Sequence, residues 1–135
     1  MKIVNVYIGF ILSIWSINAY TQHSITGIFS PLAGQQVRLV GFGGFGIYAI
    51  DSTKVSEQGI FKLNYSDKDR GMGYLAAADN KAYFVVLANE NIQLKGEMLS
   101  YPESIVTLSG NENKLFVQYA TEHPKREQAL SAWVY

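Results

Sequence analysis

The chain has 135 residues, 48% of them hydrophobic and 16% charged, which suits one domain with a substantial core and leaves no room for a second of ordinary size. Eleven basic and eleven acidic side chains cancel, so charge gives no argument for binding nucleic acid or an anionic membrane surface. Cysteine is absent, which excludes disulfides, a thiol nucleophile, a Cys-x-x-Cys redox pair, cysteine-liganded metal and a lipid-modified export cysteine.

The N-terminal residues 1–19 have the pattern of a secretory signal peptide. Lys2 precedes an apolar run from Ile3 to Ile17, and the small residue Ala19 precedes polar chain. The run is shorter than the roughly 20 residues of a membrane-spanning helix. A retained membrane anchor and a buried first strand or helix are the alternatives. We expect a signal peptide and an exported, periplasmic or cell-envelope protein that touches the membrane only through this segment, if it is not cleaved.

Residues 24–109 alternate between short strands and turns about ten residues apart, which predicts an antiparallel β-sandwich of about seven or eight strands. The clearest strand is 60–65, where Phe61, Leu63 and Tyr65 share one face. Gly59 precedes it, and we expect a turn with positive φ there. Strands 47–55 and 60–65 are expected to form a hairpin. The predicted strands are residues 24–30, 36–41, 47–55, 60–65, 71–78, 82–88, 92–95 and 104–108.

Two of these strands differ from the alternating pattern. Residues 82–88 (AYFVVLA) are apolar at successive positions, which predicts a central strand buried on both faces. Residues 71–78 (GMGYLAAA) are compatible with a strand or a short helix, and their glycines favour a strand.

The pattern becomes helical after the last strand. The sequence Ser109-Gly110-Asn111-Glu112 matches a capping box, in which the serine hydroxyl and the glutamate carboxylate bind opposite backbone amides of a helix start. Apolar residues then follow at helical spacing until Pro124, which predicts an interruption because proline lacks an amide proton. The residues at helical spacing are Leu115, Phe116, Tyr119 and Ala120 before Pro124, and Leu130, Trp133 and Val134 after it.

The chain ends on Ala-Trp-Val-Tyr without a helix stop signal. A domain rarely ends on an exposed apolar half-helix. We therefore expect residues 110–135 to be a helical connector that is truncated or that needs a partner to pack against.

The segment Gly41–Gly46 (GFGGFG) is a literal G-x-G-x-x-G sequence. A dinucleotide site requires a helix directly after such glycines, so that its N-terminus holds the pyrophosphate. Strand-forming residues 47–50 follow instead. The segment is therefore interpreted as a hairpin loop, and no nucleotide ligand is expected.

Other candidate residues fall short of a catalytic or metal site. His23 and His123 lie far apart in sequence, without the three convergent ligands that a metal needs. Asp51 and Ser52 have no histidine nearby in sequence to act as base, and a carboxylate at that place more often accepts amide hydrogen bonds. The sequence thus predicts no catalytic, cofactor-binding or metal-binding residues, and a protein that is not an enzyme. Four aromatic residues form a candidate sugar-stacking platform, although packing of the fold is the more common use of such rings: Phe42, Phe45, Tyr48 and Tyr101.

Several short sequences follow the expected export signal in a fixed order. They are Ile25-Thr26-Gly27, Val37-Arg38-Leu39, Ile50-Asp51-Ser52, Gly59-Ile60-Phe61 and Leu108-Ser109-Gly110 with Asn111 and Asn113. Over residues 24–135 the chain resembles the N-terminal domain of unknown function that precedes the thioredoxin-like domain in exported thiol–disulfide interchange proteins of Gram-negative bacteria. The resemblance implies a β-sandwich, a helical connector and an accessory role. Catalysis in that family belongs to a Cys-x-x-Cys domain that this chain lacks.

We therefore expect a non-catalytic exported accessory domain with an interaction or scaffold role. Its expected partner is a thioredoxin-like domain or another envelope protein that packs on the helical tail. The alternative is a β-sandwich module that binds a glycan or a peptide through the 41–46 loop and the nearby aromatic rings.

Overall fold

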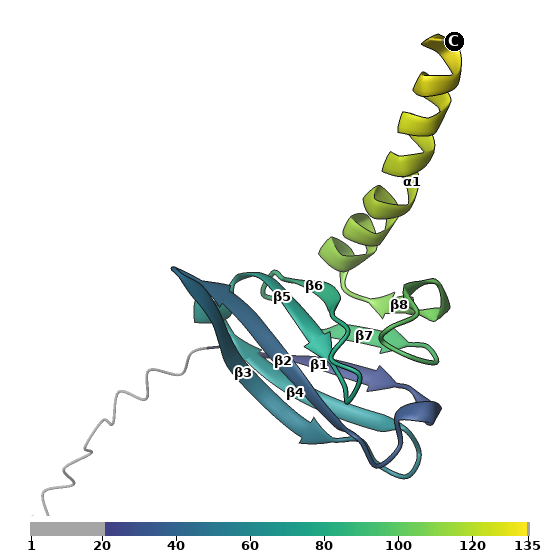
Figure 1. Cartoon of the computed structure of the whole chain (residues 1–135). Coiled ribbons are helices and arrows are strands. Elements are labelled where there is room, and N and C mark those ends of the chain that lie inside the picture. The colour runs from purple at the N-terminus through teal and green to yellow at the C-terminus, as the bar shows by residue number, and fades with distance from the viewer. Residues whose placement is uncertain (1–20, 135) are drawn as a thin grey trace, which may run out of the picture.

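A computed structural model of the chain describes residues 21–134, with side chains as far as residue 125. The fold is mainly β, with eight strands in two sheets of four and one C-terminal helix (Figure 1). The predicted sandwich with a helical tail is thus confirmed. The expected signal peptide, and the apolar face expected from Leu130, Trp133 and Val134, lie outside the described residues and side chains.

The two sheets contain equal numbers of strands. The first has the order β4-β1-β7-β8, made of β1 (Gln22–Ile28), β4 (Ile60–Ser66), β7 (Ile92–Lys95) and β8 (Val106–Ser109). The second has the order β3-β2-β5-β6, made of β2 (Gln36–Gly43), β3 (Gly46–Lys54), β5 (Gly71–Ala76) and β6 (Tyr83–Leu87). Paired strands are antiparallel except β1 and β7, which run parallel.

Alternate side chains of both sheets form the core between them. In β4 the predicted residues Phe61, Leu63 and Tyr65 are all buried, as the alternation requires. Short 3₁₀ turns join the strands, and they are η1 (Ser30–Leu32), η2 (Asp67–Asp69) and η3 (Pro102–Ser104). The core residues are Ile25, Phe29, Leu32, Val37, Leu39, Val55, Phe61, Leu63, Tyr65, Leu75, Ala77, Tyr83, Val85, Leu87, Ile92, Leu94, Leu99 and Ile105.

The turn before β4 depends on Gly59. Its φ is +78°, as the sequence predicts, and its carbonyl accepts a 2.7 Å hydrogen bond from the Phe29 amide. A Cβ atom added there would lie 2.5 Å from the Ser30 Cα atom. Both the backbone angle and the close approach of a second backbone therefore require glycine.

The expected hairpin of β3 and β4 is wrong, because the two strands lie in different sheets. They are edge strands on the same side of the sandwich, and Asp51 joins them. Its Oδ2 accepts a hydrogen bond from the Asn64 amide of β4 at 2.9 Å, and its Oδ1 accepts one from the Ser52 amide at 2.8 Å. The carboxylate thus accepts backbone amides and links the two sheets at this edge.

The prediction that residues 82–88 form a central strand is also wrong. β6 is the edge strand of its sheet, and β5 is its only strand neighbour within residues 21–134. Its inward residues Tyr83, Val85 and Leu87 are buried, but Phe84 on the other face is 47% exposed. The outer face of β6 at Phe84 is therefore partly exposed to solvent, where the sequence predicted a second buried face.

The helix α1 (Asn111–Val134) differs from prediction at two points. Ser109 belongs to β8 and caps no helix amide, because the turn at Gly110 (φ +112°) separates it from the helix start. Pro124 lies inside an unbroken helix. The ring removes one amide hydrogen bond, to the carbonyl of Ala120, and both residues are exposed, so water can solvate that carbonyl.

Candidate functional site

The start of α1 is held by a carboxylate from a distant turn. Glu90 accepts hydrogen bonds from the Asn111 amide at Oε2 and from the Glu112 amide at Oε1, both at 2.9 Å. These amides are among the four that have no partner within a helix, and the helix dipole also favours a negative charge there. Glu90 therefore caps the start of the helix, the role that the sequence predicted for Ser109.

The position of Glu90 is fixed by Tyr65 of β4. The Tyr65 hydroxyl donates to the Glu90 carbonyl and accepts a 3.1 Å hydrogen bond from the Glu90 amide. Burial raises the pKa of the Tyr65 phenol above its ordinary value, which keeps the hydroxyl protonated and able to donate. A buried strand residue, a turn and the helix start are thus joined in one hydrogen-bonded chain.

Asn113 attaches the first turn of α1 to the free edge of β6. Its Oδ1 accepts a hydrogen bond from the Val86 amide, and its Nδ2 donates to the Val86 carbonyl, both at 2.8 Å. The side chain is 3% exposed. A carboxamide has the same donor and acceptor as a peptide unit, so Asn113 occupies the place that a neighbouring strand would take beside Val86.

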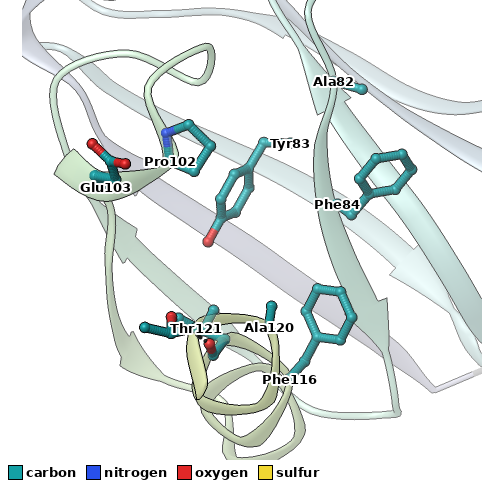
Figure 2. Close-up of a pocket in the computed structure, with 9 residues that line it drawn as sticks. Ala82, Tyr83, Phe84, Pro102, Glu103, Phe116, Ala120 and Thr121 are labelled. Atoms are coloured by element: carbon teal, nitrogen blue, oxygen red, sulfur yellow. Dashed lines mark hydrogen bonds between the residues drawn. The ribbon is translucent and has the colours of Figure 1, made fainter. Parts of the chain in front are cut away.

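An apolar groove of about 460 Å³ lies between α1, the edge of β6 and η3 (Figure 2). Phe84 and Phe116 lie on one side of it, and Pro102 and Glu103 lie on the other. Of the described residues that line it, Glu103 alone carries a charge. The lining residues are Ala82, Tyr83, Phe84, Pro102, Glu103, Phe116, Val117, Ala120 and Thr121.

Beyond its first turns, α1 projects away from the sandwich (Figure 1). It contacts β6 and β8, through which it is anchored. Leu115 is 59% exposed and Tyr119 is 61% exposed. The helical stripe expected from the sequence therefore divides, with Phe116 and Ala120 facing the groove and the other two residues facing outward.

A second aromatic surface lies on the outer face of the second sheet. Phe42, Tyr74 and Phe84 come from β2, β5 and β6, with ring centroids 5.7 to 6.3 Å apart. The Phe42 and Phe84 rings are within 18° of parallel, and each is about half exposed. Phe84 belongs to both this cluster and the groove, so the two apolar surfaces are continuous.

The four rings predicted as a platform do not come together. Of the four, only Phe42 belongs to the cluster. Phe45 is fully exposed at the tip of the β2–β3 hairpin, and Tyr101 lies beside η3. The Tyr48 hydroxyl donates a hydrogen bond to Asp69 at 3.0 Å. Burial raises the pKa of the Tyr48 phenol, and this hydrogen bond raises it further.

The glycine segment Gly41–Gly46 forms the hairpin that the sequence predicts. Gly43 pairs with Gly46, and Gly44 has a φ of +49° in the two-residue turn between them. β3 follows directly, so no helix N-terminus lies where a pyrophosphate would bind.

The two histidines lie in separate places. His23 is 2.9 Å from Asp67 Oδ1 and its ring centroid is 5.3 Å from that of Tyr65. The His123 ring stacks on Tyr119 in α1, with centroids 5.1 Å apart. Asp51 and Ser52 lie on β3, where the Asp51 carboxylate accepts hydrogen bonds from the Ser52 amide and from the Asn64 amide of β4.

A metal-binding cluster and a membrane-spanning helix are both absent from the described part of the chain. No group of three or more His, Asp or Glu side chains there could hold a metal ion. No helix in that part is long and apolar enough to cross a membrane.

Comparison with known protein families, with curated proteins and with solved structures finds no match. The sequence did not predict the groove. A signal for it was present, because residues 82–88 are apolar at successive positions, but that pattern predicts burial equally well in a central strand or under a ligand.

Proposed function

We propose that this chain is a non-catalytic accessory domain, exported to the periplasm or cell envelope, that holds a partner protein against α1. The observation that supports this role is the helix itself. Glu90 and Asn113 fix its first turn to the sandwich, and the rest projects outward beside an apolar groove. A rigidly anchored helix with apolar exposed residues is a suitable surface for helix-mediated docking.

The proposed partner is a thioredoxin-like domain or another envelope protein. The resemblance to the accessory domains of thiol–disulfide interchange proteins supports a thioredoxin-like partner. The N-terminal pattern of Lys2 and the apolar run to Ile17 supports export. Fusing residues 1–19 to a reporter that is active only outside the cytoplasm tests export directly, and an inactive reporter would count against it.

Photo-crosslinking in the native host tests the interaction role. A photoreactive amino acid at position 115 or 119 should give a crosslink to one defined envelope protein, since Leu115 and Tyr119 are the exposed large apolar residues in the described part of the helix. The matched control is position 60, because Ile60 is 46% exposed on β4. Crosslinks of the same pattern at position 60, or none at positions 115 and 119, would contradict the proposal.

The second candidate function is glycan or peptide binding on the outer face of the second sheet. The cluster of Phe42, Tyr74 and Phe84 supports it, because exposed rings side by side present apolar faces on which the C–H groups of a sugar can stack. A glycan array probed with the full chain tests this function. Signals that Phe42→Ala abolishes and Phe45→Ala leaves unchanged would support it, and an array without signal would remove it.

A further inference from the structure

The edge of β6 carries backbone groups that point away from its sheet. Asn113 binds both the amide and the carbonyl of Val86, so these groups face away from β5. In an antiparallel ladder, residues two apart direct their backbone groups to the same side. Phe84 therefore also directs its amide and carbonyl outward, beside the groove that its side chain lines.

The Phe84 backbone groups lack the partner that Val86 has. Among the described backbone of residues 21–134 and the described side chains of residues 21–125, no turn, loop or side-chain hydrogen bond ends on the Phe84 amide or carbonyl. Native edge strands are usually covered, charged or bulged, because their unpaired groups are a template for another strand. β6 is covered by Asn113 at Val86 and is open at Phe84.

We propose that the groove binds an extended peptide segment of a partner protein, which adds to β6 as a fifth strand of the second sheet. Its backbone pairs with Phe84 and continues the line of hydrogen bonds that Asn113 begins. Its alternate side chains lie against Phe116 and Ala120 of α1. This inference rests on the proposed interaction role and specifies the chemistry of the partner.

The shape and charge of the groove favour a single extended chain. Its volume of about 460 Å³ is that of a site for a short segment, with α1 on one side and η3 on the other. A second copy of this chain would bring its own α1 and η3 to the same edge, where they would compete for the same space. Glu103, the one charge among the described lining residues, favours a segment with basic residues.

Amide hydrogen exchange on the isotope-labelled full chain tests the proposal. The probe is the acetylated and amidated peptide Lys-Val-Thr-Val-Thr-Val-Lys, which prefers extended backbone and carries two basic ends. At saturation the peptide should slow exchange of the Phe84 amide by about fivefold or more, the protection expected of one backbone hydrogen bond. The Val85 amide is the internal control, since it faces β5 and should not change.

Two variants separate the backbone hydrogen bond from the aromatic ring. Phe84→Ala removes the ring and keeps the amide, while Phe84→Pro removes both. Proline is tolerated at an edge position whose amide faces away from the sheet. We expect Phe84→Ala to bind the probe weakly and Phe84→Pro not at all, with thermal unfolding used to confirm that both fold. Equal affinities of the two variants would overturn strand addition.

The remaining outcomes are also decisive. Peptide-induced shifts of α1 amides without protection of Phe84 would overturn strand addition and leave the interaction role of the helix intact. Absence of any shift at millimolar peptide would overturn the inference, whereas the crosslinks at positions 115 and 119 test the proposed function independently. Protection of Phe84 that grows with protein concentration alone would identify a second copy as the occupant and overturn the peptide proposal.

Discussion

Replacing Asn113 with alanine tests how α1 is attached to the sandwich. The substitution removes two hydrogen bonds of 2.8 Å to the Val86 amide and carbonyl from a side chain that is 3% exposed. Each such bond contributes about 0.5–1.5 kcal/mol net, and alanine regains roughly 0.6 kcal/mol of helix propensity. We expect the free energy of unfolding to fall by about 1–2 kcal/mol, because Val86 is only partly buried and water can replace part of the lost hydrogen bonding.

Urea denaturation followed by circular dichroism measures this change, since a small single domain usually unfolds in one step. The matched control is Asn111→Ala on the same helical turn. The Asn111 side chain is exposed, and none of its side-chain atoms takes part in a hydrogen bond among the described residues. The control should change stability by less than about 0.5 kcal/mol. If the two variants are equally stable, or if exchange of the Val86 amide does not accelerate in Asn113→Ala, the reasoning is refuted.

Three further predictions concern the turn at Gly59, the carboxylate of Glu90 and the buried hydroxyl of Tyr65. Gly59→Ala should lower the free energy of unfolding by about 2 kcal/mol or more, because φ is +78° and the new methyl group meets the Ser30 backbone. A calorimetric unfolding midpoint within about 2 °C of wild type, which corresponds to roughly 0.5 kcal/mol, would argue against this. Glu90→Gln should cost about 0.5–1 kcal/mol and speed exchange at the start of α1, and an unchanged urea midpoint would show that the charge is unimportant. Burial raises the pKa of the Tyr65 phenol in the folded state, so the stability that Tyr65 contributes should be complete below about pH 10 and be lost at higher pH. Tyr65→Phe should therefore make the fall of the free energy of unfolding at alkaline pH shallower in urea titrations. An unchanged dependence of that free energy on pH would contradict this.

The strands were predictable because their signal is local. Alternation of apolar and polar residues in 60–65 determines which side chains face the core, and Gly59 marks the turn before them. The strand predicted at 92–95 has the bounds of β7, and the β2–β3 hairpin turns at the predicted glycines. These features depend on residues within a few positions of each other.

Strand order and the helix cap were not predictable in the same way, because they depend on distant residues. Nothing near residues 47–65 indicates that β3 and β4 lie in different sheets, with Asp51 joining them. Ser109 has the right spacing for a capping box, but Glu90 reaches the helix amides from another turn. The local capping-box pattern does not form because the fold brings the charged Glu90 carboxylate to the free amides of the helix start.

The incorrect prediction for residues 82–88 is the most informative for function. Apolar residues on both faces of a strand predict burial, and β6 has that composition at the edge of a sheet, where Phe84 is 47% exposed. An edge strand that only had to stay soluble would carry charged or polar residues on its outer face. The proposed binding surface would account for the apolar outer face, the open Phe84 backbone beside Asn113 and the adjoining groove. Hydrogen exchange of the Phe84 amide decides whether a strand occupies it.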